Sequence, residues 1–180
     1  IDFSVAALHA AQDATSDALK HVDRLFSGRI PGPTPVSQQW VRGRSVETLP
    51  FADHSFDRIV ANLSLSFSRS PLHALRELFR VLRPGGKLIV SVITPLADMA
   101  LPYRSSLQEL GVDAFSGDAR LALNRMAQCC VALRVGQLHA FQEESLSAAL
   151  AQVTSTPTRL VRTFSGQILV ALAEKPDSAG

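Results

Sequence analysis

Cysteine is scarce in this sequence of 180 residues, and its two cysteines, Cys129 and Cys130, are adjacent. Adjacent cysteines form neither a disulfide framework nor a metal-binding set. They lie in a stretch with helical spacing of apolar residues, so we expect them to pack in the core as small hydrophobic residues. The low cysteine content fits a reducing compartment, and we therefore predict a cytoplasmic location.

The sequence also lacks long runs of one kind of residue. Lys and Arg number 18 and Asp and Glu number 16, which gives a formal net charge of +2 without a long basic run. We therefore expect neither nucleic acid nor a membrane surface as a partner. The longest apolar stretches, such as Leu88 to Ile93, have the length of a strand and predict no membrane span. With 46% hydrophobic and 19% charged residues, the composition is that of one globular domain.

The five histidines do not form a metal-binding set. His9, His21, His73 and His139 lie in separate segments, and none has metal-ligand spacing to another His or Cys. His54 lies in a loop before an expected strand, and we interpret it as a turn residue. We predict no bound metal.

Hydrophobic periodicity and turn residues predict alternating helices and strands. The expected helices are Val5–Phe26, Pro71–Leu82, Ala119–Leu133 and Glu143–Val153. The expected strands are Gln39–Arg42, Phe56–Leu63, Lys87–Ile93, Arg159–Phe164 and Gln167–Ala173. This order favours an α/β fold with an open, mostly parallel sheet, helices on both faces and an antiparallel hairpin at the C-terminal edge.

The clearest unit is a strand, a helix and a second strand between Phe56 and Ile93. Ser70 is expected to cap the helix, with Pro71 as its first residue. The run from Arg83 to Gly86 is expected to end the helix and turn the chain. Paired glycines can cradle a phosphate when they open a helix. Because Gly85 and Gly86 follow a helix and precede a strand, we predict a structural turn instead.

Two motifs in this unit carry a resemblance. The segment L-P-F-A-D-H-S-F-D at positions 49–57 precedes one strand, and L-R-P-G-G-K-L at positions 82–88 precedes the next. This pair of motifs, at this spacing, resembles the class I S-adenosylmethionine-dependent methyltransferases that act on small molecules. The resemblance covers Ile1 to about Ile93, and the C-terminal hairpin is similar to the last two strands of that fold. It implies a Rossmann-like sheet and S-adenosylmethionine as the cofactor.

The resemblance implies four cofactor-binding residues. Asp2 takes the place of the family's ribose carboxylate, and Phe3 lies beside the adenine ring. An acidic residue at the end of a strand also suits ribose hydroxyls on general grounds, although an exposed Asp near the N-terminus needs no such role. Ser45 stands where the family usually has an Asp that holds the adenine amino group, so this contact is weakened, while backbone contacts at Val46 survive the change. We expect Glu47 to be a solvated residue at a helix start.

Asn62 ends the first strand of the unit. Ligands of open parallel sheets bind outside the carboxyl ends of the strands, which places Asn62 toward the cofactor or substrate. An Asn at this position can equally cap its own turn. The sequence leaves both interpretations open.

The predicted function is the transfer of a methyl group from S-adenosylmethionine to a small-molecule substrate. No general base is identified, although Tyr103 and Arg104 are candidates within the weakly patterned stretch from Thr94 to Phe141. A non-catalytic domain of the same fold, acting as a binding or scaffold partner, is the alternative and would explain Ser45. A nicotinamide-dependent oxidoreductase would need a G-x-G-x-x-G motif, which this sequence lacks. The oligomeric state is left open.

The motifs also bear on domain organisation. We expect residues 1–175 to form one domain and residues 176–180 a loose tail. In the family that the sequence resembles, the first strand, the glycine-rich loop and the first crossover helix precede the position of Ile1. We therefore expect the 180 residues to be part of a methyltransferase domain, without the half of the cofactor site that the glycine-rich loop supplies.

Overall fold

The computed structural model describes residues 45–98 and 135–177, together with residues 9, 10, 13, 41, 43, 101, 108, 128, 131 and 132. The chain divides into two compact units, Ile1–Ser45 and Val46–Gly180. Of the predicted helices Val5–Phe26 and Ala119–Leu133, only single residues are described, and these are helical. The predicted strand Gln39–Arg42 is described only at Val41, which belongs to no strand. Among the described residues, no helix has the length and apolar character to cross a membrane.

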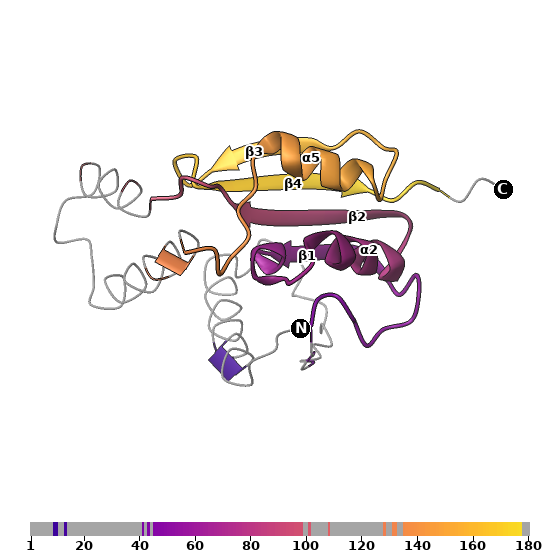
Figure 1. Cartoon of the computed structure of the whole chain (residues 1–180). Coiled ribbons are helices and arrows are strands. Elements are labelled where there is room, and N and C mark those ends of the chain that lie inside the picture. Colours follow the sequence, from indigo (N-terminus) through magenta and orange to yellow (C-terminus); the bar gives the residue numbers. More distant parts are fainter. Residues whose placement is uncertain are drawn as a thin grey trace, which may run out of the picture. The chain divides into compact units, whose positions relative to one another are not determined.

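The second unit contains a four-stranded sheet in the order β1-β2-β4-β3 (Figure 1). Its strands are β1 (Phe56–Asn62), β2 (Leu82–Ile93), β3 (Arg159–Thr163) and β4 (Ile168–Glu174). Strands β1 and β2 run parallel, whereas β4 is antiparallel to both β2 and β3. This confirms the predicted open α/β sheet with an antiparallel C-terminal hairpin.

Two helices cover one face of this sheet (Figure 1). They are α2 (Pro71–Val81) and α5 (Glu143–Ala151), and a short 3-10 helix, η1 (Ser64–Phe67), precedes α2. Leucines of both helices and alternate residues of β2 and β4 form one buried cluster, which includes Leu75, Leu78, Leu146, Leu150, Leu88, Val90, Leu169 and Ala171. Full burial of one such leucine contributes about 1.5–3 kcal/mol, so this face is the main source of stability.

The predicted turn from Arg83 to Gly86 is wrong, because these residues belong to strand β2. The Gly85 N–H donates to the Lys175 carbonyl and the Lys175 N–H donates to the Gly86 carbonyl, both at 2.9 Å. Lys175 thus continues the ladder beyond the end of β4. Gly85 has a φ of 67° and lies where the β1–β2 register is irregular, so the chain bulges here rather than turning. The prediction of a structural role for the two glycines, as opposed to a phosphate cradle, is retained.

The start of α2 is predicted correctly in position and incorrectly in its capping group. Ser70 is the N-cap residue and Pro71 follows it, but the Ser70 side chain makes no capping hydrogen bond. Instead, Oε1 of Glu47 accepts from the Arg69 N–H (2.7 Å) and the Ser70 N–H (3.2 Å). The Glu47 carboxylate therefore fixes the chain just before the helix, and it does not bond the N–H groups of the first helical turn, which a capping hydroxyl would do.

The predicted C-terminal hairpin is confirmed to within one residue at each strand end. Its turn consists of residues 164–167, in which Phe164, Ser165 and Gly166 have φ values of 53°, 52° and 83°. A run of left-handed residues matches the right-handed twist of the two strands. Glycine accepts this conformation without strain, so Gly166 suits its position in the turn.

Candidate functional site

The carboxyl ends of β1 and β2 lie side by side and bring Asn62 next to Ser91. The two residues are register partners. Their strand neighbours Ala61 and Val90 belong to the buried cluster under the helices, so Asn62 and Ser91 project from the opposite face. The Ser91 hydroxyl donates to Oδ1 of Asn62 at 2.5 Å. This contact joins the two strands at the edge where ligands of parallel sheets bind.

Ser91 also holds the turn that follows β1. The Leu63 N–H donates to both the carbonyl and Oγ of Ser91, each at 3.0 Å. Leu63 has a φ of 55°, a left-handed conformation that ends the strand and turns the chain into η1. The Asn62 side chain therefore does not cap its own turn, because Ser91 does so. The Asn62 amide group lies at an exposed strand end, and its role toward a cofactor or substrate stays a prediction.

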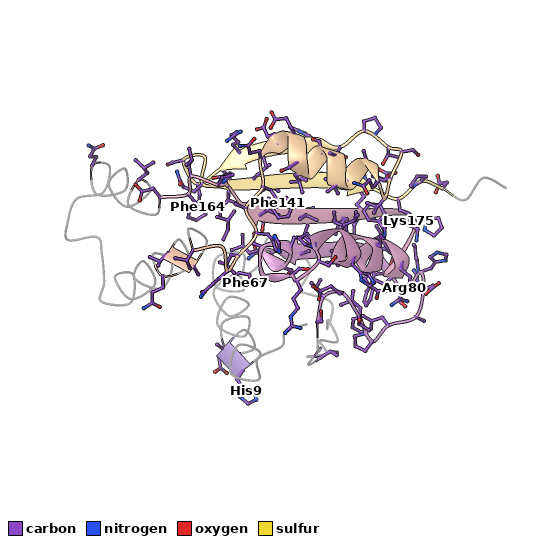
Figure 2. All side chains as sticks on the ribbon, viewed as in Figure 1. His9, Phe67, Arg80, Phe141, Phe164 and Lys175 are labelled. Carbon is purple, nitrogen blue, oxygen red and sulfur yellow. The ribbon has the colours of Figure 1, made fainter. Side chains whose placement is uncertain are left out.

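A returning segment closes the same edge beside η1. The His139 N–H donates to the carbonyl of Ser66 (2.8 Å), and the Phe141 N–H donates to the carbonyl of Ile93 (2.9 Å). The hydroxyl of the buried Ser66 accepts from the Ile93 N–H at 3.2 Å. Figure 2 shows Phe67 and Phe141 at this end of the sheet, with Arg80 and Lys175 at the other end. The edge is thus built from three segments far apart in the sequence.

The first residues after β2 are also tied down. The Thr94 hydroxyl is 3.2 Å from the Gly166 carbonyl and 3.1 Å from the Gln167 carbonyl. The side chain of the buried Gln167 accepts from the Asp98 N–H and donates to the Ser165 carbonyl. The chain therefore leaves β2 along a path fixed by the hairpin turn.

The other predicted site residues have different outcomes. Asp2 and Phe3 lie outside the described residues, as do Tyr103, Arg104 and the two adjacent cysteines. Ser45 is half-buried and lies at the end of the first unit. Val46 is buried, and its side chain is part of the apolar cluster, so only its backbone is available to a ligand. The role of each of these residues toward a cofactor stays a prediction.

Glu47 is not the solvated helix-start residue that we expected. Its carboxylate accepts from the Ser68 hydroxyl at 2.5 Å in addition to the two N–H groups before α2. Burial raises the pKa of Glu47, but the hydrogen bonds from Ser68 and from the backbone outweigh burial and lower the pKa overall. Glu47 thereby fastens the segment that carries Val46 to the chain between η1 and α2, six residues beyond Asn62. Its role in this position is structural.

The L-P-F-A-D motif is held on α2 by Arg80. The guanidinium donates to the Leu49 carbonyl (3.2 Å), the Phe51 carbonyl (2.9 Å) and the Asp53 carboxylate (2.7 Å). Phe51 in turn makes an edge-on contact with Phe56, with ring centroids 4.9 Å apart. These contacts explain the motif as a fold-forming element at the end of the sheet away from Asn62. His54, in the same loop, is exposed with a φ of 57° and is a turn residue, as predicted.

A shallow hollow of about 460 Å³ lies along the outer face of α2, lined by Ser70, Leu72, His73, Arg76, Glu77 and Arg80. Of the charged groups that line it, Glu77 and Arg80 are paired with each other. The hollow does not include the strand ends, and it presents a single apolar side chain, whereas ligand pockets are predominantly apolar. We assign the site to the sheet edge and not to this hollow. Across residues 45–98 and 135–177, no three His, Cys, Asp or Glu side chains form a group that could hold a metal ion.

The geometry defines a Rossmann-like α/β domain with polar groups at the carboxyl edge of its parallel strands. A family model described as a methyltransferase domain matches residues 1–90, which is half of the chain. The chain belongs to this family of methyltransferase domains. S-adenosylmethionine is the cofactor that the family and fold imply. At the described edge, the exposed amide of Asn62 fits its oxygen atoms, since an amide N–H is a suitable donor to hydroxyls and carboxylates.

Curated relatives share only part of the chain. Over 49 residues it is 51% identical to a malonyl-[acyl-carrier protein] O-methyltransferase of Erwinia pyrifoliae, which is 27% of this chain and 19% of that protein. Over 80 residues it is 38% identical to a ubiquinone/menaquinone biosynthesis C-methyltransferase of Roseobacter denitrificans, which is 44% of this chain and 32% of that protein. The matches therefore cover less than a third of these relatives.

A solved structure supports the fold. A protein of Methanosarcina mazei, titled as belonging to the SAM-dependent methyltransferases, superposes with a TM-score of 0.51. The match covers 98% of this chain and 81% of that chain at 19% identity. At this level of identity the similarity establishes a shared fold.

The sequence did not predict the hydrogen bonds by which Ser91, Ser66 and Glu47 hold the sheet edge and the segments next to it. A signal existed for Ser91, because it is the one polar residue inside the apolar run from Leu88 to Ile93. A polar side chain in such a strand needs a hydrogen-bond partner if it is buried. No comparable local signal marks Ser66 or Glu47, since their partners lie 27 and 21 to 23 residues away.

Proposed function

We propose that this chain is part of an S-adenosylmethionine-dependent methyltransferase that transfers a methyl group to a small-molecule acceptor. The family match to residues 1–90 is the observation that carries the proposal. The polar edge at Asn62 and Ser91 supports it, because this edge lies where the fold class binds its ligands. The similarity to a malonyl-[acyl-carrier protein] O-methyltransferase and to a ubiquinone/menaquinone biosynthesis C-methyltransferase favours a small or carrier-linked acceptor.

The residues of the chain would act mainly by binding and positioning. S-adenosylmethionine, when bound, supplies a methyl group that is already activated on a sulfonium. Asp2 would accept hydrogen bonds from the ribose and Phe3 would lie against the adenine. Asn62 would donate to an oxygen atom of the cofactor. Holding the acceptor in line with the methyl group supplies much of the rate enhancement in such a transfer. A catalytic base is needed only if the acceptor is a hydroxyl, which must lose its proton.

The experiment is a calorimetric titration of the full-length gene product with S-adenosylmethionine and with S-adenosylhomocysteine. We expect saturable binding of both. Asp2→Ala should weaken binding of both by about tenfold, since a charge-assisted hydrogen bond contributes about 1.5–3 kcal/mol. Asp13→Ala is the matched control, because Asp13 is an exposed acidic residue elsewhere in the same unit. Absence of binding by the wild-type protein would refute the enzyme and leave the non-catalytic domain as the remaining candidate.

A further inference from the structure

Ser91 and Asn62 form an arrangement in which the direction of each hydrogen bond is determined. Oγ of Ser91 accepts from the Leu63 N–H at 3.0 Å and carries a single proton of its own. That proton needs an acceptor, because Ser91 is 9% exposed and thus largely removed from water. Oδ1 of Asn62, at 2.5 Å, is that acceptor.

The alternative amide orientation fits less well. If the Asn62 amide were rotated by half a turn, its N–H groups would face Oγ of Ser91. The Ser91 proton would then have no acceptor among the side chains that the structure describes around it. The hydrogen-bond network therefore selects the orientation with the oxygen toward Ser91. The amide nitrogen, with two N–H donors, lies on the other side of the group, at an exposed strand end.

From this geometry we infer that Ser91 is a positioning residue that makes the sheet edge a hydrogen-bond donor site, selective for an acceptor oxygen of the cofactor. The inference rests on the proposed function and adds to it the residue that sets the polarity of the Asn62 contact. The amino-acid carboxylate of S-adenosylmethionine has this chemistry, because its oxygen atoms can only accept, whereas a ribose hydroxyl can also donate. Ser91 itself does not touch the ligand. It acts by fixing the direction of the Asn62 amide.

The first test is the pair Asn62→Asp and Asn62→Ala, measured by titration of the full-length protein with S-adenosylhomocysteine. Asn62→Asp keeps an oxygen that accepts from Ser91 but replaces the two outward donors with a charged acceptor. We expect it to weaken binding more than Asn62→Ala does, by about tenfold or more against about fivefold, because facing acceptors repel. Equal or tighter binding by Asn62→Asp than by Asn62→Ala would overturn the inference.

A second ligand tests whether the carboxylate is this acceptor. 5′-Methylthioadenosine has the adenine, ribose and thioether of the cofactor but lacks the carboxylate. We expect Asn62→Asp to weaken S-adenosylhomocysteine and to leave the binding of 5′-methylthioadenosine unchanged. Equal weakening of both ligands would overturn the assignment to the carboxylate, and unchanged binding of both ligands would refute the donor edge.

A Ser91 variant could lose affinity simply because the fold is weakened. The test of its positioning role therefore needs a measurement that such a loss would not reproduce. Ser91→Ala should weaken S-adenosylhomocysteine about threefold in the wild-type background and have no further effect in the Asn62→Ala background, because it acts through Asn62. Ser91→Thr keeps the hydroxyl and should restore affinity. Ser64→Ala is the control, since its hydroxyl donates to the Asn62 carbonyl, at 3.4 Å, and not to the side-chain amide. An equal Ser91→Ala effect in both backgrounds would refute positioning, and failure of the wild type to bind would instead refute the proposed function.

Discussion

Arg80 forms a two-point ion pair with Glu77, one turn earlier on α2. Nε of Arg80 lies 2.8 Å from Oε1 of Glu77, and Nη2 lies 2.9 Å from Oε2. The same carboxylate accepts from the Leu49 N–H at 3.1 Å. Both side chains thus bind the loop before β1 as well as each other, which makes the pair more than a surface contact along a helix.

Replacing Arg80 with Met should destabilise the fold by about 1–3 kcal/mol, because it removes donors from two backbone carbonyls and two carboxylates. The loss of stability is no larger than this because the Arg80 side chain is partly exposed, so water replaces some of the lost hydrogen bonds. Arg76→Met is the matched control, since Arg76 is exposed on the same helix. Urea unfolding gives the two free energies of unfolding. Equal losses in the two variants would show that the Arg80 contacts contribute nothing specific.

Acidification should expose the contribution of Glu77. Its pairing with Arg80 lowers its pKa below the ordinary value of 4.5, against the opposing effect of burial. A carboxylate with a lower pKa in the folded state stabilises the fold above its unfolded pKa, and this stabilisation is lost as the pH falls through the folded pKa. We expect stability to decline below about pH 4.5, and Glu77→Gln to make this decline shallower. The measurement is the urea midpoint between about pH 7 and pH 3, with Glu144→Gln as the control at an exposed position of α5.

Glu47→Ala should loosen the start of α2. The change leaves the Arg69 and Ser70 N–H groups and the Ser68 hydroxyl without their shared acceptor. A hydrogen bond to a charged group contributes about 1.5–3 kcal/mol when it is buried and less when its donors are exposed, so we expect a decrease of about 1–2 kcal/mol in the free energy of unfolding. Thr48→Ala, at the exposed neighbouring position, should have little effect. Hydrogen exchange of the first turn of α2 should accelerate in Glu47→Ala and not in the control.

Two glycine substitutions should separate steric from conformational cost. A Cβ on Gly86 would lie 2.7 Å from the Arg83 carbonyl oxygen, so Gly86→Ala forces the backbone of the bulge to move. A Cβ on Gly166 would meet nothing within 4 Å. The cost of Gly166→Ala is therefore only the conformational strain of an alanine at a φ of 83°. We expect losses of about 2–3 kcal/mol for Gly86→Ala and about 1 kcal/mol for Gly166→Ala in thermal unfolding. The reverse order would mean that the bulge at Gly86 relaxes freely.

Elements with strong local signals were predictable from the sequence. Leu75, Leu78 and Phe79 recur with helical spacing and are buried in α2, which ends at Val81, one residue before the predicted end. Asn62 ends β1 at the predicted sheet edge. In these cases periodicity and turn residues determine the structure locally.

Features set by distant partners were not predictable. Ser70 is a residue type that commonly caps helices, yet its side chain makes no capping bond here. Its N–H donates to the carboxylate of Glu47, which lies 23 residues away in the sequence. The run from Arg83 to Gly86 has the composition of a turn, yet pairing with Lys175 draws it into β2. The position of Asn62 at the sheet edge was predictable from the fold class. Its contact with the Ser91 hydroxyl was not predictable, because Ser91 lies on a neighbouring strand.

The chain leaves β2 and returns to the sheet edge at two points that are fixed by hydrogen bonds. At the first, Asp98 is bonded to Gln167, and at the second, His139 and Phe141 are bonded to Ser66 and Ile93. The groups involved are backbone groups and buried side chains of the hairpin turn, β2 and η1. The exit and the return of the chain are therefore set by the same scaffold that positions the strand ends, so a change that weakens this scaffold should affect both points together.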